Sequence, residues 1–166
     1  FFFVAIPLCC SSMIIQIRNL QKLVPINTSW VQRIVHEVGK LTNTDDYDIC
    51  MWLVDNEMSH KINLEERKKD KPADVLSVPL HPDNPPGTRP PELADEYDLG
   101  DIYISLEMLE QQAKEREIDF DTQLKKTIIH GYCHLLGYDH ETDSDFKLML
   151  EEEKRLYQHV SQLNKE

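Results

Sequence analysis

The sequence predicts one α+β domain, α/β-like in its alternation of strands and helices, in which a small sheet packs against several helices. Two observations lead to this prediction. The 166 residues are 40% hydrophobic and 29% charged, which is enough apolar material for one core but too little chain for two full domains. Short apolar runs also alternate with amphipathic stretches along the chain.

The first half of the chain predicts strand, helix, strand and helix in turn. Residues 13–18 (MIIQIR) form an apolar run typical of a strand. Residues 28–41 show helical spacing of apolar side chains and begin with a capping threonine or serine. Residues 47–54 predict a second strand, and an aspartate or asparagine then begins a helix over residues 55–67.

The second half continues this alternation. Residues 75–80 predict a strand whose proline indicates an edge position or the end of the strand. The proline-rich residues 81–98 are too long for a plain connection and are either mobile or functional. A short strand follows over residues 101–105. The remaining helices are predicted over residues 105–117, 121–136 and 143–163.

Residues 1–12 are expected to lie outside the fold, which leaves a single domain over residues 13–166. Their apolar run, FFFVAIPLCC, is about half as long as the ~20 residues that cross a bilayer, so it predicts no membrane span. We interpret it as the remnant of a presequence or as translated sequence upstream of Met13. Without a CxxC pair, the four cysteines support neither a disulfide framework nor a zinc ribbon.

Negative charge is concentrated in the second half. Residues 90–166 carry 8 basic and 19 acidic side chains, whereas residues 1–89 carry 10 and 11. The net charge of −12 argues against a protein that coats nucleic acid, but it is compatible with an enzyme that has a local basic cleft. Acidic helices would also repel a duplex more than a single strand. The charged run in the last helix predicts a solvated face. Basic residues cluster in one place, at Arg67, Lys68, Lys69 and Lys71.

The most informative segment is TIIHGYCHLLGYDH, residues 127–140. His130 and His134 lie one turn apart on one face of a predicted central, buried helix. Gly137 is placed to turn the chain, so that His140 folds over the other two histidines. Three histidines with this spacing can hold one zinc ion and leave a fourth position for water. The alternative is a coincidental spacing of core or surface histidines.

The spacing H-x-x-x-H-x-x-G-x-x-H matches the metzincin zinc motif, but Gly131 stands where those peptidases carry their catalytic glutamate. A peptidase of that mechanism is therefore disfavoured. Cys133 is expected to be a core thiol rather than a fourth ligand. Asp139 either orients an imidazole or is a turn residue. The histidines without ligand spacing are His36, His60, His81 and His159.

Three blocks together resemble the YbeY family of metal-dependent, single-strand-specific endoribonucleases that act in ribosomal RNA maturation. They are residues 67–79 (RKKDKPADVLSVP), 99–104 (LGDIYI) and 130–140 (HGYCHLLGYDH), and the resemblance extends from Met13 onwards. The chain differs from the family pattern at three positions, none of which is a predicted metal ligand. These differences bear on substrate preference more than on metal binding. Thr, Phe and Leu are common in the family where this chain has Ala73, Val78 and Cys133.

The resemblance implies that His130, His134 and His140 bind one zinc ion per chain and that Arg67 faces the substrate phosphate. It also implies a role for Asp101, in the LGD block, in function and in docking on a small-subunit ribosomal protein. The implied partners are single-stranded RNA, such as an rRNA precursor, and that ribosomal protein, with no membrane. The residues alone favour a solvated arginine for Arg67 and a strand-start or turn carboxylate for Asp101.

This set of residues suits phosphodiester hydrolysis, since zinc can supply hydroxide at neutral pH and arginine adds permanently charged donors. Two alternatives stay open: a ribosome-assembly factor whose zinc is structural, and a metal hydrolase that acts on a small molecule or peptide. A three-histidine site without a fourth protein ligand favours catalysis. The Cys133 variant and the leader-like start predict a mitochondrial protein, with cytoplasm or nucleus as alternatives.

Overall fold

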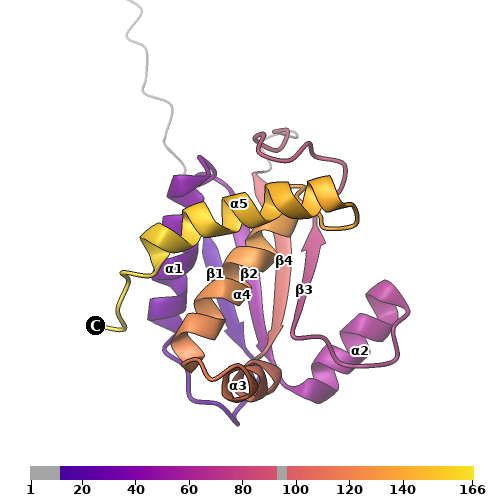
Figure 1. Ribbon diagram of the computed structural model, residues 1–166, viewed down its shortest axis with the longest axis vertical. Coiled ribbons are helices and arrows are strands. Elements are labelled where there is room, and N and C mark those ends of the chain that lie inside the picture. Colours follow the sequence, from indigo (N-terminus) through magenta and orange to yellow (C-terminus); the bar gives the residue numbers. More distant parts are fainter. Residues whose placement is uncertain (1–11, 93–96) are drawn as a thin grey trace, which may run out of the picture.

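The computed structural model describes residues 12–92 and 97–166, within which four strands and five helices form one layered fold (Figure 1). The strands are β1 (Ile15–Asn19), β2 (Asp48–Val54), β3 (Val75–Pro79) and β4 (Asp98–Ser105). The helices are α1 (Thr28–Leu41), α2 (Asn56–Arg67), α3 (Leu106–Glu115), α4 (Phe120–Leu135) and α5 (Asp143–Val160). The predicted α+β class is confirmed, while residues 1–11 of the expected leader-like segment lie outside the described part of the chain.

The sheet is mixed, with the strand order β1-β2-β4-β3. β1, β2 and β4 run parallel, and β3 pairs antiparallel with β4 at the edge of the sheet. Pro79, which has no backbone N–H to donate, is the last residue of β3. The proline was therefore a correct sign both of an edge strand and of a strand end.

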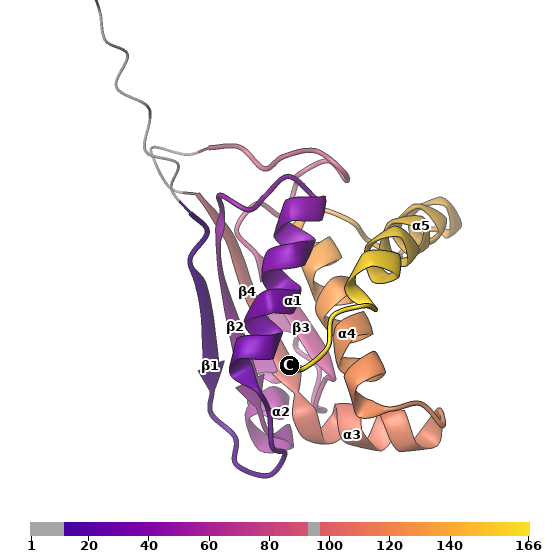
Figure 2. The same cartoon turned by 90° about the vertical axis from the view of Figure 1, so that its left-hand side faces the viewer.

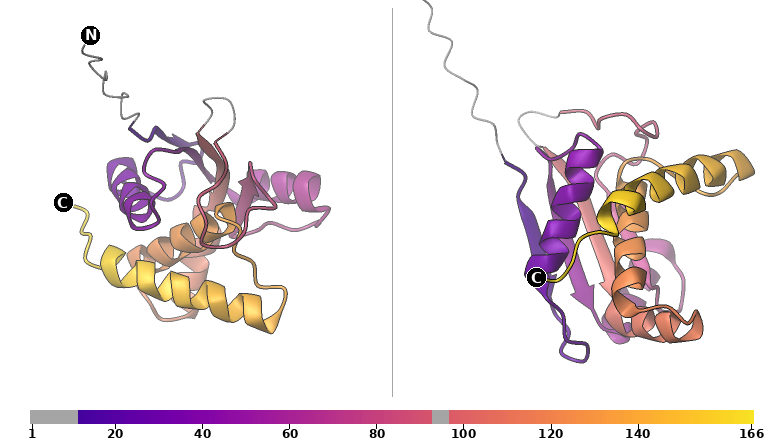
Figure 3. Two further views of the ribbon diagram at one scale, coloured as in Figure 1. Left: turned by 90° about the horizontal axis from the view of Figure 1, so that it is seen from above. Right: turned by 60° about the vertical axis from the view of Figure 1, so that its left-hand side comes forward.

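Three helices, α1, α4 and α5, cover one face of the sheet, and α2 lies beyond the β3 edge (Figures 1 and 2). Seen from above, α4 lies between the sheet and α5 (Figure 3). This position makes α4 the central helix that the sequence predicts, because both of its sides meet protein. No helix within the described residues is long and apolar enough to cross a membrane. The largest fully buried side chains include Trp30, Tyr47, Tyr132, Ile34, Met51, Leu53, Ile102 and Ile104.

Helix starts follow the local chemistry of the chain. Asp55 and Ser105 are predicted start residues, and the side chain of each accepts a hydrogen bond from the backbone N–H three residues further on. α1 also begins at Thr28, but its cap is Asn27, whose side chain accepts a hydrogen bond from the N–H of Trp30. The sequence located this helix correctly but assigned its cap to Thr28 or Ser29, one or two residues too late.

α4 and the sheet come into close contact at Gly131. A Cβ atom added there would lie 3.0 Å from Cγ2 of Ile102 and 3.2 Å from Oγ of Ser77. The Ser77 hydroxyl donates a hydrogen bond of 2.8 Å to the Gly131 carbonyl oxygen. Position 131 therefore faces β3 and β4, and a glutamate at this position would push the helix off the sheet. This is a structural reason why the peptidase glutamate has no place in this fold.

The loop after β3 supports the turn that follows α4. The side-chain amide of Asn84 donates a hydrogen bond of 3.3 Å to the carbonyl oxygen of Leu136. Gly137 follows with φ of 89°, and a Cβ atom added there would lie 1.9 Å from the Asn84 carbonyl oxygen. The predicted turn glycine is confirmed, and both its left-handed backbone and the close approach of the loop require glycine.

We predict that Gly137→Ala lowers the free energy of unfolding by at least about 1 kcal/mol. A non-glycine residue is strained at this φ, and its Cβ would also overlap Asn84. Urea denaturation of the metal-free protein measures the change. Since the turn also carries His140, the same substitution should weaken metal binding. An unchanged denaturation midpoint would contradict the role given to this turn.

Candidate metal centre

The three predicted histidines meet at one point between α4 and the chain that follows it. His130 and His134 project from α4, and their Nε2 atoms are 3.2 Å apart. The ring of His140 lies 5.5 Å from that of His130 and 5.0 Å from that of His134, centre to centre. One ligand atom from each residue lies within 4.8 Å of the others. Among the described residues, no other group of three or more His, Cys, Asp or Glu side chains meets this condition.

Hydrogen bonds fix which nitrogen of each α4 histidine is free. Nδ1 of His134 is 3.0 Å from the carbonyl oxygen of Tyr138, which can only accept, so Nδ1 carries the proton. Nδ1 of His130 is 2.6 Å from Oε1 of Glu153, and an ionised carboxylate imposes the same tautomer. With Nδ1 of each ring engaged in this way, the two Nε2 atoms face the same space and are the nitrogens available to a metal ion.

The two Nε2 atoms are 3.2 Å apart, close enough for one cation to be bound by both. Two nitrogen ligands of a tetrahedral zinc ion, each about 2.0–2.1 Å from the metal, are separated by about 3.3–3.4 Å. The spacing of the two Nε2 atoms therefore fits a bound metal ion. The cluster of His130, His134 and His140 could hold such an ion.

Burial keeps His134 in the form that binds metals. Removal from water, and then the neighbouring rings of His130 and His140, lower the pKa of His134 to about 4. The imidazole is consequently neutral throughout the physiological range. Because only the neutral ring offers a lone pair, no proton has to be removed from His134 before it binds a cation at neutral pH.

Glu153 is a part of the site that the sequence did not reveal. The charged run in the last helix, residues 151–154, was expected to form a solvated face, and this prediction was wrong for two of its members. The Glu153 side chain is only 25% exposed and bonds to His130. That of Glu152 is 15% exposed and pairs with Arg155 at 2.7 Å. Glu153 meets His130 because α5 crosses α4 (Figure 1). Glu152 lies instead beside Arg155 and the loop residues Thr42 and Gly87.

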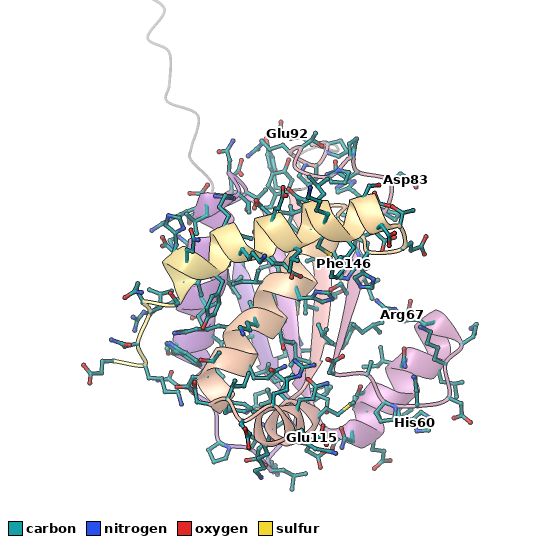
Figure 4. The ribbon with its side chains drawn as sticks, viewed as in Figure 1. His60, Arg67, Asp83, Glu92, Glu115 and Phe146 are labelled. Atoms are coloured by element: carbon teal, nitrogen blue, oxygen red, sulfur yellow. The ribbon has the colours of Figure 1, made fainter. Side chains whose placement is uncertain are left out.

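A cavity of about 370 Å³ opens at the three histidines, and three cationic side chains line it together with the carboxylates of Asp74 and Glu153. Arg67 reaches it from the C-terminal end of α2 (Figure 4), Arg116 from the end of α3 and Lys126 from α4. Partial burial lowers the pKa of Arg67 below its usual value, but the guanidinium stays protonated at any physiological pH. The predicted proximity of Arg67 to the histidines is therefore present in the structure.

A second hollow of about 550 Å³ adjoins the cluster, and Arg67 and Lys69 line it together with His134 and His140. The two spaces share Arg67, Ser77, His134 and His140, so they are neighbours. The second hollow is also lined by the carboxylates of Asp139 and Glu141.

Asp101 does not join this site. It lies in β4 next to Ile102, whose side chain faces α4, and successive strand residues point to opposite faces of a sheet. The Asp101 carboxylate instead accepts a hydrogen bond of 3.0 Å from Nε1 of Trp52, on the face away from α4. Among the predicted functional residues it is the one that the structure separates from the histidines.

The structure also shows the roles of two residues close to the histidines in sequence, Cys133 and Asp139. Cys133 is fully buried, and burial raises the pKa of its thiol, which confirms the predicted core role. Asp139 accepts a hydrogen bond of 2.7 Å from the backbone N–H of His140. This contact is that of a turn residue, and the carboxylate that orients an imidazole is Glu153 instead.

The fold and the site together define an α+β protein with a three-histidine cluster in a cavity that Arg67, Arg116 and Lys126 also line. The family model described as Endoribonuclease YbeY matches residues 16–161. The chain therefore belongs to the YbeY endoribonuclease family, a family of metalloenzymes.

Individual relatives agree with this assignment. Endoribonuclease YbeY of Homo sapiens is 36% identical over 143 residues, which cover 86% of this chain and 85% of the relative. The protein of the same name from Carboxydothermus hydrogenoformans is 34% identical, over 85% of this chain and 93% of its own length. A solution structure from Thermotoga maritima superposes with a TM-score of 0.61 at 27% identity, covering 89% of each chain.

We predict that Glu153→Gln weakens metal binding about 10- to 100-fold, because an amide holds the Nδ1 proton of His130 less strongly than a carboxylate does. Competition with a chromogenic chelator measures the affinity. Glu151→Gln removes an exposed charge two residues away in the same helix and is the matched control. Equal losses in the two variants would mean that Glu153 acts only through its charge at long range.

Proposed function

We propose that this protein is a zinc-dependent endoribonuclease that cleaves single-stranded RNA during ribosomal RNA processing. The observation that carries the proposal is the pair of converging Nε2 atoms, 3.2 Å apart, at the wall of a cavity that Arg67 also lines. Membership of an endoribonuclease family supports RNA as the substrate class.

Zinc is the metal that the donor set favours. Imidazole nitrogens suit zinc, and three protein ligands with an open fourth position are typical of catalytic rather than structural zinc sites. His130, His134 and His140 would hold the ion. When bound, zinc supplies Lewis acidity and lowers the pKa of a coordinated water to about 7.

The protein's own groups have separate tasks at this site. Arg67 offers planar, permanently charged donors to the non-bridging oxygens of a phosphodiester, and these contacts strengthen as those oxygens gain charge. Lys126 and Arg116 add positive charge along the same cavity. Glu153 keeps the proton of His130 on Nδ1, which leaves Nε2 as the ligand atom.

A preference for single strands fits the charges around the cavity. Three cations, Arg67, Arg116 and Lys126, line its walls with two carboxylates, and α5 carries further exposed acidic residues such as Glu151. A duplex would bring a second row of phosphates against this helix, whereas a single strand can follow the cationic wall. Glu153 is engaged by His130, so the exposed residues of α5 would provide the repulsion.

The proposal also includes a protein partner and a cellular location. Asp101, on the sheet face away from the histidines, is available for docking on a small-subunit ribosomal protein while RNA occupies the cavity. A mitochondrial location accords with the likeness to the human relative.

We predict that His134→Ala abolishes stoichiometric zinc binding and lowers the thermal midpoint of the zinc-loaded protein, since metal binding is linked to folding. Elemental analysis and thermal denaturation measure the two effects. His159→Ala, which removes a histidine outside the cluster, should keep both unchanged. Full zinc occupancy in the His134 variant would contradict the ligand assignment.

We predict that Arg67→Glu keeps the zinc content and the thermal midpoint but loses at least about 100-fold in cleavage of single-stranded RNA, because a charge-assisted contact to the reacting phosphate is replaced by repulsion. Lys61→Glu reverses an exposed charge on the same helix and is the matched control. A zinc-loaded wild-type protein that binds ribosomal subunits but cuts no RNA would instead identify an assembly factor.

A further inference from the structure

A third hollow adjoins the histidine cavity and has a different chemical character. It lies between α4 and α5 and has a volume of about 360 Å³. Two residues, Lys126 and Glu153, line both this hollow and the histidine cavity, so the two spaces are neighbours. We call it the α4–α5 pocket, and its lining residues are Lys126, Ile129, Leu150, Glu153, Lys154 and Tyr157.

The α4–α5 pocket combines apolar and aromatic side chains with charged ones. Ile129, Leu150 and Tyr157 line it together with Lys126, Glu153 and Lys154. The ammonium of Lys126 lies over the Tyr157 ring, 5.5 Å from its centre. An aromatic side chain with a cation close by suits a flat, aromatic group that is attached to an anion. The base of a nucleotide has this combination of properties.

Helical geometry places the pocket one turn away from the histidines. Lys126 precedes His130 by four residues on α4, which corresponds to about 6 Å along the helix axis. On α5, Tyr157 follows Glu153 by four residues, and Glu153 bonds directly to His130. A single nucleotide is long enough to connect a phosphate at the histidines with a base in the pocket.

We propose that the α4–α5 pocket binds the base of the nucleotide next to the phosphodiester that lies at the histidine cluster, with Lys126 contacting the phosphate between them. The inference rests on the proposed function and extends it to a base-binding subsite. Continuity with the histidine cavity and the shared cation favour an RNA base over an unrelated apolar ligand. Tyr157 and Leu150 are then residues that determine substrate affinity.

The test uses a single-stranded RNA decamer with one cleavage position and a set of decamers that each lack one base. With the zinc-loaded wild-type protein, loss of one particular base beside the cleaved bond should lower kcat/KM about 5- to 100-fold, as expected for the loss of one base contact with an aromatic wall. Loss of bases elsewhere should have a smaller effect. Absence of any sensitive position in the wild-type protein would overturn the subsite.

Substitutions on α5 test whether the sensitive base binds in the α4–α5 pocket. Tyr157→Ala should lower kcat/KM for the intact decamer by a similar factor, mainly through KM, and removal of the sensitive base should then cause no further loss. Tyr157→Phe keeps the ring and should stay within about twofold of wild type. Leu148→Ala, which truncates a 47% exposed side chain on the same helix, is the control. Fully additive effects of Tyr157→Ala and base removal would overturn the proposal.

Zinc content and the thermal midpoint of each variant separate binding from folding. If Tyr157→Ala does not fold, Leu150→Ala widens the same pocket and should show a smaller loss at the same base. Zinc-loaded wild-type protein that cleaves no single-stranded RNA would overturn the proposed function, and the subsite with it. Cleavage without a sensitive base would overturn the subsite alone.

Discussion

The contact between Gly131 and the sheet determines where everything else at the site can lie. Because this residue has no side chain, the backbone of α4 approaches β3 and β4 closely enough for Ser77 to bond to the Gly131 carbonyl oxygen. With position 131 against the sheet, the helical spacing directs His130 and His134 to the side, into the space that Arg67 reaches from α2. A larger residue at position 131 would move both ligands together.

The cavity shows how a chain with a net charge of −12 can present a local cationic surface. Its positive groups, Arg67, Arg116 and Lys126, come from α2, α3 and α4, and none of them is adjacent to another in the sequence. Interactions between exposed charges are screened beyond roughly 10 Å at moderate salt. The three cations, together with the carboxylates of Asp74 and Glu153 on the same walls, therefore influence an anion in the cavity more strongly than the acidic residues on distant surfaces do.

Features that depend on neighbouring residues were predictable from the sequence, and features that depend on how helices cross were not. The spacing of His130 and His134, the turn at Gly137 and the edge position of Pro79 follow from local geometry and were predicted correctly. Glu153 was assigned to a solvated face because the periodicity of α5 does not show which helix it meets. Asp101 was grouped with the site because a motif does not reveal which face of the sheet its residues occupy.

The three histidines are held by three different parts of the chain, and this arrangement couples metal binding to the whole fold. His130 depends on α5 through Glu153, and His134 is oriented by the carbonyl oxygen of Tyr138 in the turn after its own helix. His140 follows that turn, which Asn84 of the loop after β3 supports. The ligands therefore converge only when α5 and this loop are both in place. Since such a site does not exist in the unfolded chain, the free energy of metal binding adds to the stability of the assembled fold.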